Sequence, residues 1–121
     1  MKSNNLLNSF KYAFEGIKKA FMMERNLKIH ISCMFIIIIL GIILNISLWE
    51  WIICILLFSL VISSELINTA IEEVVNLLSL DIKPHAKYAK DIAAGFVLIN
   101  AICSFIIGII IFAPKIFSLF N

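Results

Sequence analysis

The chain has 121 residues, of which 62% are hydrophobic and 15% charged, and its formal net charge is +2. An ordinary soluble domain carries about 25% charged residues, and a chain this short buries only about 60–70% of its surface on folding. So much apolar surface excludes a soluble globular domain and indicates a lipid bilayer as the solvent. The small net charge gives no sign of nucleic-acid binding, and the length predicts one domain spanning residues 1–121.

The first predicted element is an amphipathic helix within residues 1–28. Apolar residues recur there at intervals of three and four, with lysine and glutamate residues between them. Next to a membrane span, this pattern predicts a helix that lies on the membrane surface or packs on the protein's own helix bundle, and it does not separate the two. The apolar positions are Leu6, Leu7, Phe10, Phe14, Ile17 and Phe21.

Three apolar segments follow at 29–48, 49–75 and 92–112, and each is long enough to cross a bilayer, which takes about 20 helical residues. The second becomes polar toward its C-terminal end, and the third is expected to end before Pro114. The β-branched residues do not indicate strands, because open strands cannot satisfy their backbone groups inside lipid. The sequence therefore predicts an all-α integral membrane protein, with a surface helix, three transmembrane helices and a loop at 76–91.

Lysine and arginine residues set the expected orientation, because cytoplasmic segments are enriched in them. Six precede the first span, three lie in the loop at 76–91, and one follows the third span. The turn between the first two spans carries the acidic Glu50, flanked by Trp49 and Trp51. We therefore expect a multi-pass protein of the cell membrane, with its N-terminus and the 76–91 loop in the cytoplasm and its C-terminus outside.

A polar stripe on the second span is the clearest sign of function. It consists of Glu65, Asn68, Thr69 and Glu72. These positions, i, i+3, i+4 and i+7, share one face of a helix, and the two carboxylates lie about 10 Å apart along its axis. A charge at mid-membrane costs about 2.5–3.5 kcal/mol on insertion scales and usually has a function. Polar residues also join membrane helices, but two acids and an amide on one cytoplasmic face favour a site.

The stripe has the chemistry that phosphoryl transfer from ATP requires. That reaction needs metal ions on the triphosphate and a group that orients or deprotonates the acceptor hydroxyl, and Mg²⁺ prefers carboxylates together with phosphate oxygens. Glu24, just before the first span, is the expected third acid beside Glu65 and Glu72. Lys90 and Asp91 could contact a nucleotide, although both are also ordinary residues at the start of a span. Neither GxxxxGK[ST] nor GxGxxG occurs.

The segment ELINTAIEEVVN resembles the signature of the prokaryotic diacylglycerol kinase family, Glu-x-x-Asn-Ser/Thr-Ala-Ile-Glu-x-x-x-Asp. The similarity extends along nearly the whole chain through FKYAFEGIKKAF, ERNLKIH and AKDIAAGFVLI. ERNLKIH and KYAFEGI are more similar to the Gram-positive branch, whose members are mostly undecaprenol kinases. The resemblance implies a homotrimer with active sites at the membrane–cytoplasm interface, shared between neighbouring subunits. It also implies that MgATP phosphorylates a membrane lipid alcohol, with undecaprenol as the expected acceptor and diacylglycerol as the alternative.

The resemblance further implies roles for individual residues. Glu65 would be the general base toward the lipid hydroxyl, and Asn68 would orient Glu65 or the acceptor. Glu24 and Glu72 would hold Mg²⁺ on the ATP phosphates. The remaining expected contacts are Tyr12 near the adenine, Asp81, Lys83, Lys90 and Asp91 at the nucleotide together with Glu24 and Glu72, and Asn26 and His30 at the lipid together with Glu65.

The chain departs from the family pattern in two places. The final Asp of the signature is Asn76 here, and a loop position where relatives often carry His is Lys83, with His85 two residues further on. Asn76 gives some support to an inactive relative that acts as a membrane assembly partner. A proton-coupled transporter with Glu65 as its protonatable group is the alternative from another class, although Glu72, a second acid two turns away, favours the kinase.

Overall fold

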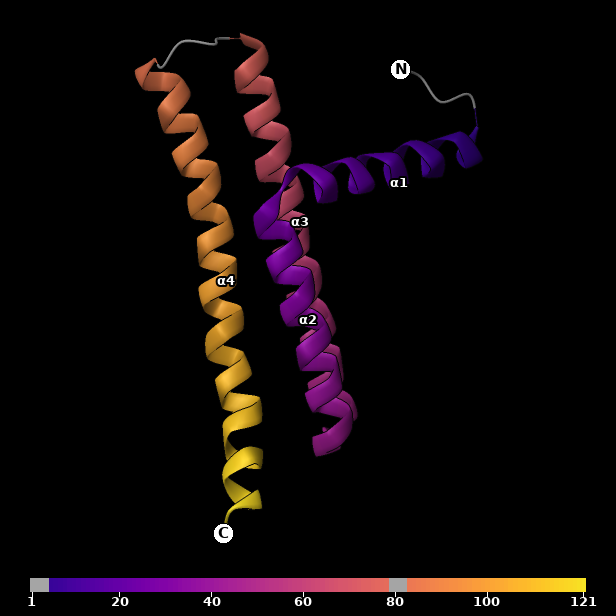
Figure 1. The fold of residues 1–121 in the computed structure, drawn as a ribbon, viewed down its shortest axis with the longest axis vertical. Helices are drawn as coiled ribbons and strands as arrows, with labels where there is room; N and C mark the ends of the chain where they lie inside the picture. The colour runs from indigo at the N-terminus through magenta and orange to yellow at the C-terminus, as the bar shows by residue number, and fades with distance from the viewer. Residues whose placement is uncertain (1–4, 79–82) are drawn as a thin grey trace.

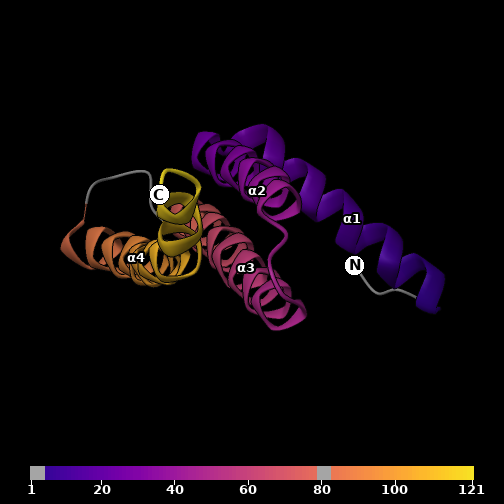
Figure 2. The same ribbon diagram turned by 90° about the horizontal axis from the view of Figure 1, so that it is seen from below.

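The computed structural model describes residues 5–78 and 83–121, and within these ranges the chain is entirely helical apart from short connections. The helices are α1 (Leu6–Met23), α2 (Arg25–Leu44), α3 (Leu48–Leu78) and α4 (Pro84–Leu119). Figure 1 shows α2, α3 and α4 side by side along the molecule, with α1 projecting sideways from the start of α2. Viewed along the three long helices, α1 extends away from α4 (Figure 2). The all-helical prediction is confirmed.

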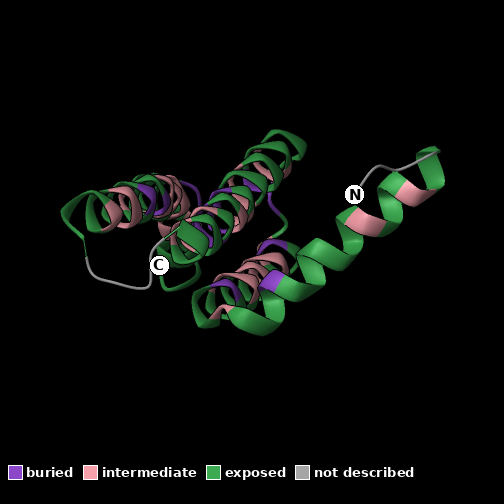
Figure 3. Ribbon diagram, turned by 90° about the horizontal axis from the view of Figure 1, so that it is seen from above, coloured by how far each residue is buried: buried purple, intermediate pink, exposed green. Residues whose placement is uncertain are grey.

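Helices α2, α3 and α4 are long and apolar enough to cross a membrane. In their most apolar 18-residue windows only 11%, 33% and 17% of the residues are buried inside the chain. Figure 3 shows the result, since most of each ribbon is exposed or half-buried. Soluble monomers rarely expose apolar patches beyond a few hundred Å², so the chain is a multi-pass membrane protein.

Helix α2 ends in a local hydrogen-bond motif. Asn45 adopts the left-handed conformation with φ 53°, and the N–H of Ile46 donates to the Gly41 carbonyl at 3.2 Å. This arrangement is the usual way in which a helix end satisfies its last carbonyl groups. The helix therefore stops at Leu44, whereas the sequence predicts a span over 29–48.

The start of α3 is fixed by a capping box. The N–H of Glu50 donates to Ser47 Oγ at 3.2 Å, and the N–H of Ser47 donates to Glu50 Oε1 at 2.9 Å, so each residue satisfies a free donor of the other. Lys115 Nζ lies 3.2 Å from the same carboxylate oxygen, which ties α4 to this turn. The expected end before Pro114 is not observed, because α4 continues through this proline to Leu119.

Gly41 gives α2 and α3 the room to approach each other. A Cβ at this position would lie 2.6 Å from Cη2 and 2.9 Å from Cζ2 of the Trp51 indole. We expect Gly41→Ala to destabilise the fold by about 1–3 kcal/mol, the usual cost of overpacking, and to lower the unfolding temperature in detergent. Gly95→Ala is the matched control, because a Cβ there meets no described atom within 4 Å. Equal stability of the two variants would contradict the prediction.

Candidate active site

The second half of α3 buries polar side chains. Within residues 5–78 and 83–121, the polar or charged residues classed as buried are Ser64, Glu65, Asn68 and Thr69. Three of them belong to the stripe that the helical spacing predicts, and Glu72 follows, half-buried, on the next turn. Removing a carboxylate from water costs free energy, whereas burying an apolar side chain is favourable. Glu65, at 1% exposure, is therefore the residue whose position most needs a reason.

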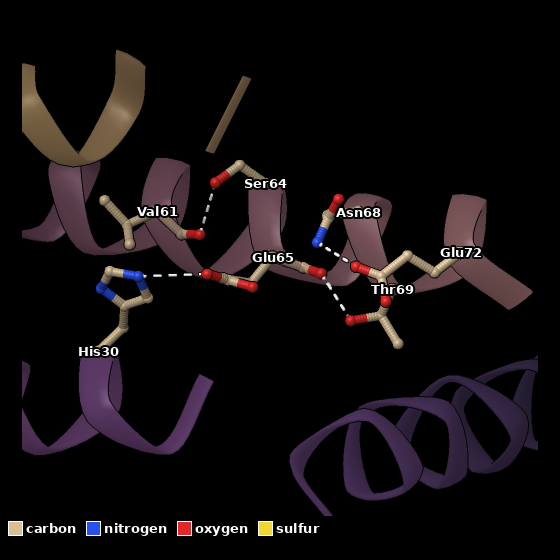
Figure 4. A network of polar contacts seen from close by, with 7 residues as sticks. All are labelled: His30, Val61, Ser64, Glu65, Asn68, Thr69 and Glu72. Carbon is tan, nitrogen blue, oxygen red and sulfur yellow. Dashed lines mark hydrogen bonds and ion pairs between the residues drawn. The ribbon is translucent and has the colours of Figure 1, made fainter. Parts of the chain in front are cut away.

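Among the described residues, the side-chain partner of the Glu65 carboxylate is a histidine of the neighbouring helix. Its Oε1 lies 3.2 Å from Nε2 of His30 on α2, and Figure 4 shows the two side chains pointing toward each other. The other oxygen, Oε2, is buried and has no hydrogen-bond partner among the residues that the structure describes. A buried polar atom without a partner is rare in proteins and needs an explanation, of which a catalytic role is one.

Asn68 is bonded to Glu72 rather than to Glu65. Its Nδ2 donates to Glu72 Oε1 at 2.8 Å, whereas its buried Oδ1 has no partner in the described part of the chain. Asn68 thus holds one acid of the stripe and presents a free acceptor on the same helical face. Thr69 is tied to its own helix, because its hydroxyl donates to the Glu65 carbonyl at 2.9 Å.

Glu24 lies between two helices and close to the stripe. It is at once the C-terminal cap of α1 and the N-terminal cap of α2, with an extended backbone at φ −109° and ψ 115°. Partial burial, together with the negative charges of Glu72 and Glu65, raises the pKa of its carboxyl above the ordinary 4.5, and the nearby Thr69 hydroxyl opposes this shift. The three acids that the sequence singles out therefore interact electrostatically in the folded chain.

The acids fit a partial magnesium site. No three His, Cys, Asp or Glu side chains of the described ranges converge as a complete metal site. Mg²⁺ is commonly bound through one or two carboxylates and completes its octahedron with water and phosphate oxygens. Glu24 and Glu72 are two such donors whose mutual repulsion a divalent cation would relieve.

Glu24 should make the stability of the metal-free protein depend on pH. Because its pKa is raised in the folded state, the folded chain binds this proton more tightly than the unfolded chain does. The stabilisation is complete below 4.5 and is lost as the pH rises through the raised value. We therefore expect Glu24→Gln, which stays uncharged, to unfold at a higher temperature than the unsubstituted protein at pH 7 without Mg²⁺.

Thermal unfolding in detergent at several pH values, with and without Mg²⁺, measures this effect. Added Mg²⁺ should stabilise the unsubstituted protein more than Glu24→Gln, because the variant lacks one of the two donors. Glu15→Gln is the control, since Glu15 is an exposed glutamate of α1. An unfolding temperature below that of the unsubstituted protein at pH 7 would contradict the prediction for Glu24.

Two lysines of α4, Lys87 and Lys90, are bonded to groups other than the three acids. Lys90 Nζ, on α4, donates to Asn76 Oδ1, on α3, at 2.8 Å, and Lys87 forms an ion pair with Asp91 one turn along α4. The amide of Asn76 holds Lys90 without cancelling its charge, which a carboxylate at this position would do. No hydrogen bond or ion pair between described residues joins Lys90 or Asp91 to the three acids.

The other predicted site residues are spread around this centre. Tyr12 lines a cavity of about 430 Å³ between α1 and α3, which Thr69 also lines. Asn26 is exposed at the start of α2, and Lys83 is exposed at the residue before α4. Asp81 lies outside the described residues.

Sequence reasoning missed the His30–Glu65 contact, although it placed both residues at the lipid. The available signal was a polar residue in the first span near its N-terminal end, at a depth that the stripe on the second span also reaches. Spacing within one helix cannot reveal such a contact, because the contact depends on how two helices align.

An apolar cavity of about 560 Å³ lies between α2, α3 and α4. Its wall is almost entirely apolar side chains of the three helices, such as Met34, Phe58 and Ile109, and it also includes His30. The cavity is therefore bordered by the residue that holds Glu65. A pocket of this kind, with few polar groups at one end, suits an apolar ligand with one polar group.

The chain is similar to known lipid kinases along most of its length. Residues 11–112 match the model of a family described as prokaryotic diacylglycerol kinase. The chain is 42% identical over 113 residues to an undecaprenol kinase of Bacillus subtilis, covering 93% of this chain and 92% of the relative. It is 39% identical over 116 residues to a diacylglycerol kinase of a Synechocystis species, covering 95% of this chain and 66% of the relative.

Proposed function

The chain belongs to the prokaryotic diacylglycerol kinase family and is a membrane lipid kinase, and we propose that it transfers the γ-phosphoryl group of MgATP to undecaprenol. The observation that carries this proposal is the buried carboxylate of Glu65, whose Oε2 has no partner among the described residues. It lies beside two further acids, Glu24 and Glu72, that suit a magnesium ion. The undecaprenol acceptor is supported by the 42% identical relative of that name, and diacylglycerol is the alternative acceptor.

Glu65 acts as the general base in this proposal. Its Oε2 accepts the proton of the lipid hydroxyl while the hydroxyl oxygen of the lipid forms a bond to the γ-phosphorus. The bond from the γ-phosphorus to the bridging oxygen breaks at the same time, and ADP leaves with the electron pair. A base within hydrogen-bond reach of the acceptor typically contributes about 10²–10⁴-fold to the rate.

Glu24 and Glu72 hold Mg²⁺ on the ATP phosphates in this proposal, and Asn68 fixes Glu72 through the 2.8 Å hydrogen bond. Bound Mg²⁺ supplies the positive charge that neutralises the triphosphate. Lys90 and Asp91 contact the nucleotide. Among the residues farther from the acids, Tyr12 lies near the adenine, Asp81 and Lys83 contact the nucleotide, and Asn26 and His30 lie at the lipid.

The apolar cavity between α2, α3 and α4 supports a lipid as the acceptor. Its volume of about 560 Å³ and its almost wholly apolar wall suit a hydrocarbon chain. His30 is in this wall, so a chain in the cavity has its hydroxyl end close to the His30–Glu65 contact. Ile, Leu and Phe side chains contact acyl and prenyl chains alike, and the choice of acceptor therefore needs a direct comparison.

We further propose a homotrimer, with the N-terminus and residues 76–91 in the cytoplasm. The trimer is supported by large exposed apolar surfaces. Only 11% and 17% of the residues in the most apolar 18-residue windows of α2 and α4 are buried within one chain. Shared sites would also explain why Lys90 and Asp91 do not contact the acids of their own chain. The expected surface position of α1 is supported by its exposed apolar side chains, which are Leu6, Leu7, Phe10, Phe14, Ile17 and Phe21.

The acceptor test compares undecaprenol and diacylglycerol in identical detergent micelles, at the same mole fraction, with purified protein and radiolabelled MgATP. Both lipids are tested in parallel, with Glu65→Gln as the inactive control. We expect undecaprenol to give the higher kcat/KM. A higher value for diacylglycerol would assign the alternative acceptor. No labelled lipid from either acceptor, together with ATP-independent substrate flux in vesicles, would overturn the kinase in favour of a transporter.

A further inference from the structure

The carboxylate of Glu65 is held at one oxygen and free at the other. Its side chain is 2% exposed and lies 3.2 Å from Nε2 of His30, whose side chain is 25% exposed. As the general base of the proposed function, Glu65 is ionised and can only accept hydrogen bonds, so Nε2 then carries the hydrogen, whether the imidazole is neutral or protonated. The contact is therefore a donation from His30 to Oε1, which leaves Oε2 without a described partner.

No other described side chain competes with His30 for this carboxylate. The hydroxyls of Ser64 and Thr69 donate to main-chain carbonyls of α3, at 2.7 Å and 2.9 Å. The amide of Asn68 donates to a different carboxylate, one turn further along the helix. Each nearby donor on α3 thus has an acceptor elsewhere, and the orientation of the Glu65 carboxylate depends on a residue of α2.

From this geometry we propose that His30 is a positioning residue for Glu65. The hydrogen bond from Nε2 to Oε1 fixes the rotation of the carboxylate, so that Oε2 is the oxygen that faces the lipid hydroxyl. The proposal rests on the proposed function, in which Glu65 is the general base.

The position of His30 in the apolar cavity supports this role. His30 lines the cavity together with Met34 and Ile37 on the following turns of α2. A lipid chain in this cavity brings its hydroxyl end to the imidazole, and the imidazole in turn contacts the base. His30 therefore lies where the acceptor and Glu65 meet.

Loss of the hydrogen bond should lower the rate of phosphoryl transfer while leaving nucleotide binding unchanged. Without it the carboxylate turns freely, and misplacing a reacting group by about 1 Å costs about 100-fold in rate. We expect His30→Phe, which keeps an aromatic ring but has no donor, to lower kcat by about 10–100-fold. The KM for ATP should stay the same, because the proposed ligands of the nucleotide metal, Glu24 and Glu72, are other acids than the one that His30 holds.

The test measures kcat, KM for ATP and the unfolding temperature in detergent for a set of purified proteins. His30→Gln keeps an N–H donor at a similar reach and should recover most of the rate that His30→Phe loses. Ser32→Ala is the matched control on α2, because the Ser32 hydroxyl is exposed and donates to the carbonyl of Lys28. If His30→Phe does not fold, His30→Met, which has similar length and no donor, takes its place.

The outcomes separate this proposal from the kinase function itself. If the unsubstituted protein phosphorylates lipid and His30→Phe matches its kcat, the positioning role is overturned and the kinase function stands. If His30→Gln loses as much activity as His30→Phe, or if KM for ATP rises with the loss of kcat, the histidine serves packing and the proposal is again overturned. If the unsubstituted protein forms no phosphorylated lipid, both are overturned.

Discussion

Replacing Glu65 with glutamine should lower the rate of lipid phosphorylation by at least about 100-fold, since a positioned general base contributes about 10²–10⁴-fold. Glutamine has nearly the same size as glutamate, and its carbonyl oxygen can still accept the hydrogen bond from His30 Nε2. Its amide, however, cannot take the proton of the lipid hydroxyl. The expected loss is therefore one of chemistry, measured as the initial rate at saturating ATP and lipid.

The folded state of Glu65→Gln is the necessary companion measurement. Removing a buried charge should leave the proposed homotrimer intact and the unfolding temperature at least as high as in the unsubstituted protein, because a charge buried away from water carries a desolvation cost. Glu73→Gln is the matched control, since Glu73 is an exposed acid of the same helix that lies off the stripe. Unchanged turnover in Glu65→Gln would remove Glu65 from its role as the base.

The second large effect is expected at Glu72. Glu72→Gln should raise the Mg²⁺ concentration for half-maximal activity by at least about 10–100-fold, because that range is seen when a residue behind a metal ligand is lost and Glu72 is proposed to bind the ion itself. The variant keeps an oxygen that can accept from Asn68 Nδ2, so the helix face is preserved while the charge is lost. Activity at very high Mg²⁺ should approach that of the unsubstituted protein.

Glu24→Gln should behave in the same way, because Glu24 and Glu72 are proposed to hold one ion. A Mg²⁺ titration at fixed, saturating ATP measures both variants, with Glu15→Gln, at an exposed glutamate of α1, as the control. If both variants followed the titration curve of the unsubstituted protein, the assignment of the metal would be wrong. If only Glu72→Gln shifted, Glu24 would act on the charge of the site without binding the ion.

The helical stripe was predictable from the sequence because a helix places positions i, i+3, i+4 and i+7 on one face whatever surrounds it. The structure buries Glu65, Asn68 and Thr69 on this face. The three spans were predictable for a similar reason, since length and hydropathy alone decide whether a helix can cross a bilayer. The kinase reading needed the family resemblance, because spacing does not name a reaction.

Contacts between helices were not predictable from spacing. The donation from His30 to Glu65 depends on the rotation and depth of α2 against α3, which packing such as the Gly41–Trp51 approach sets. The bond from Lys90 to Asn76 likewise joins two helices. Helix ends also differ from the expected ones, because local bonds at Asn45 end α2 early.

The position of Glu24 between two helices makes the number of residues in this region matter. Glu24 caps both α1 and α2, and His30 follows on the second turn of α2. One residue inserted between them would turn α2 by about 100° and shift it by about 1.5 Å relative to Glu24. Either the Glu24 carboxylate or the His30 imidazole would then no longer face the stripe on α3. Insertions and deletions in this segment should therefore be excluded from active members of the family.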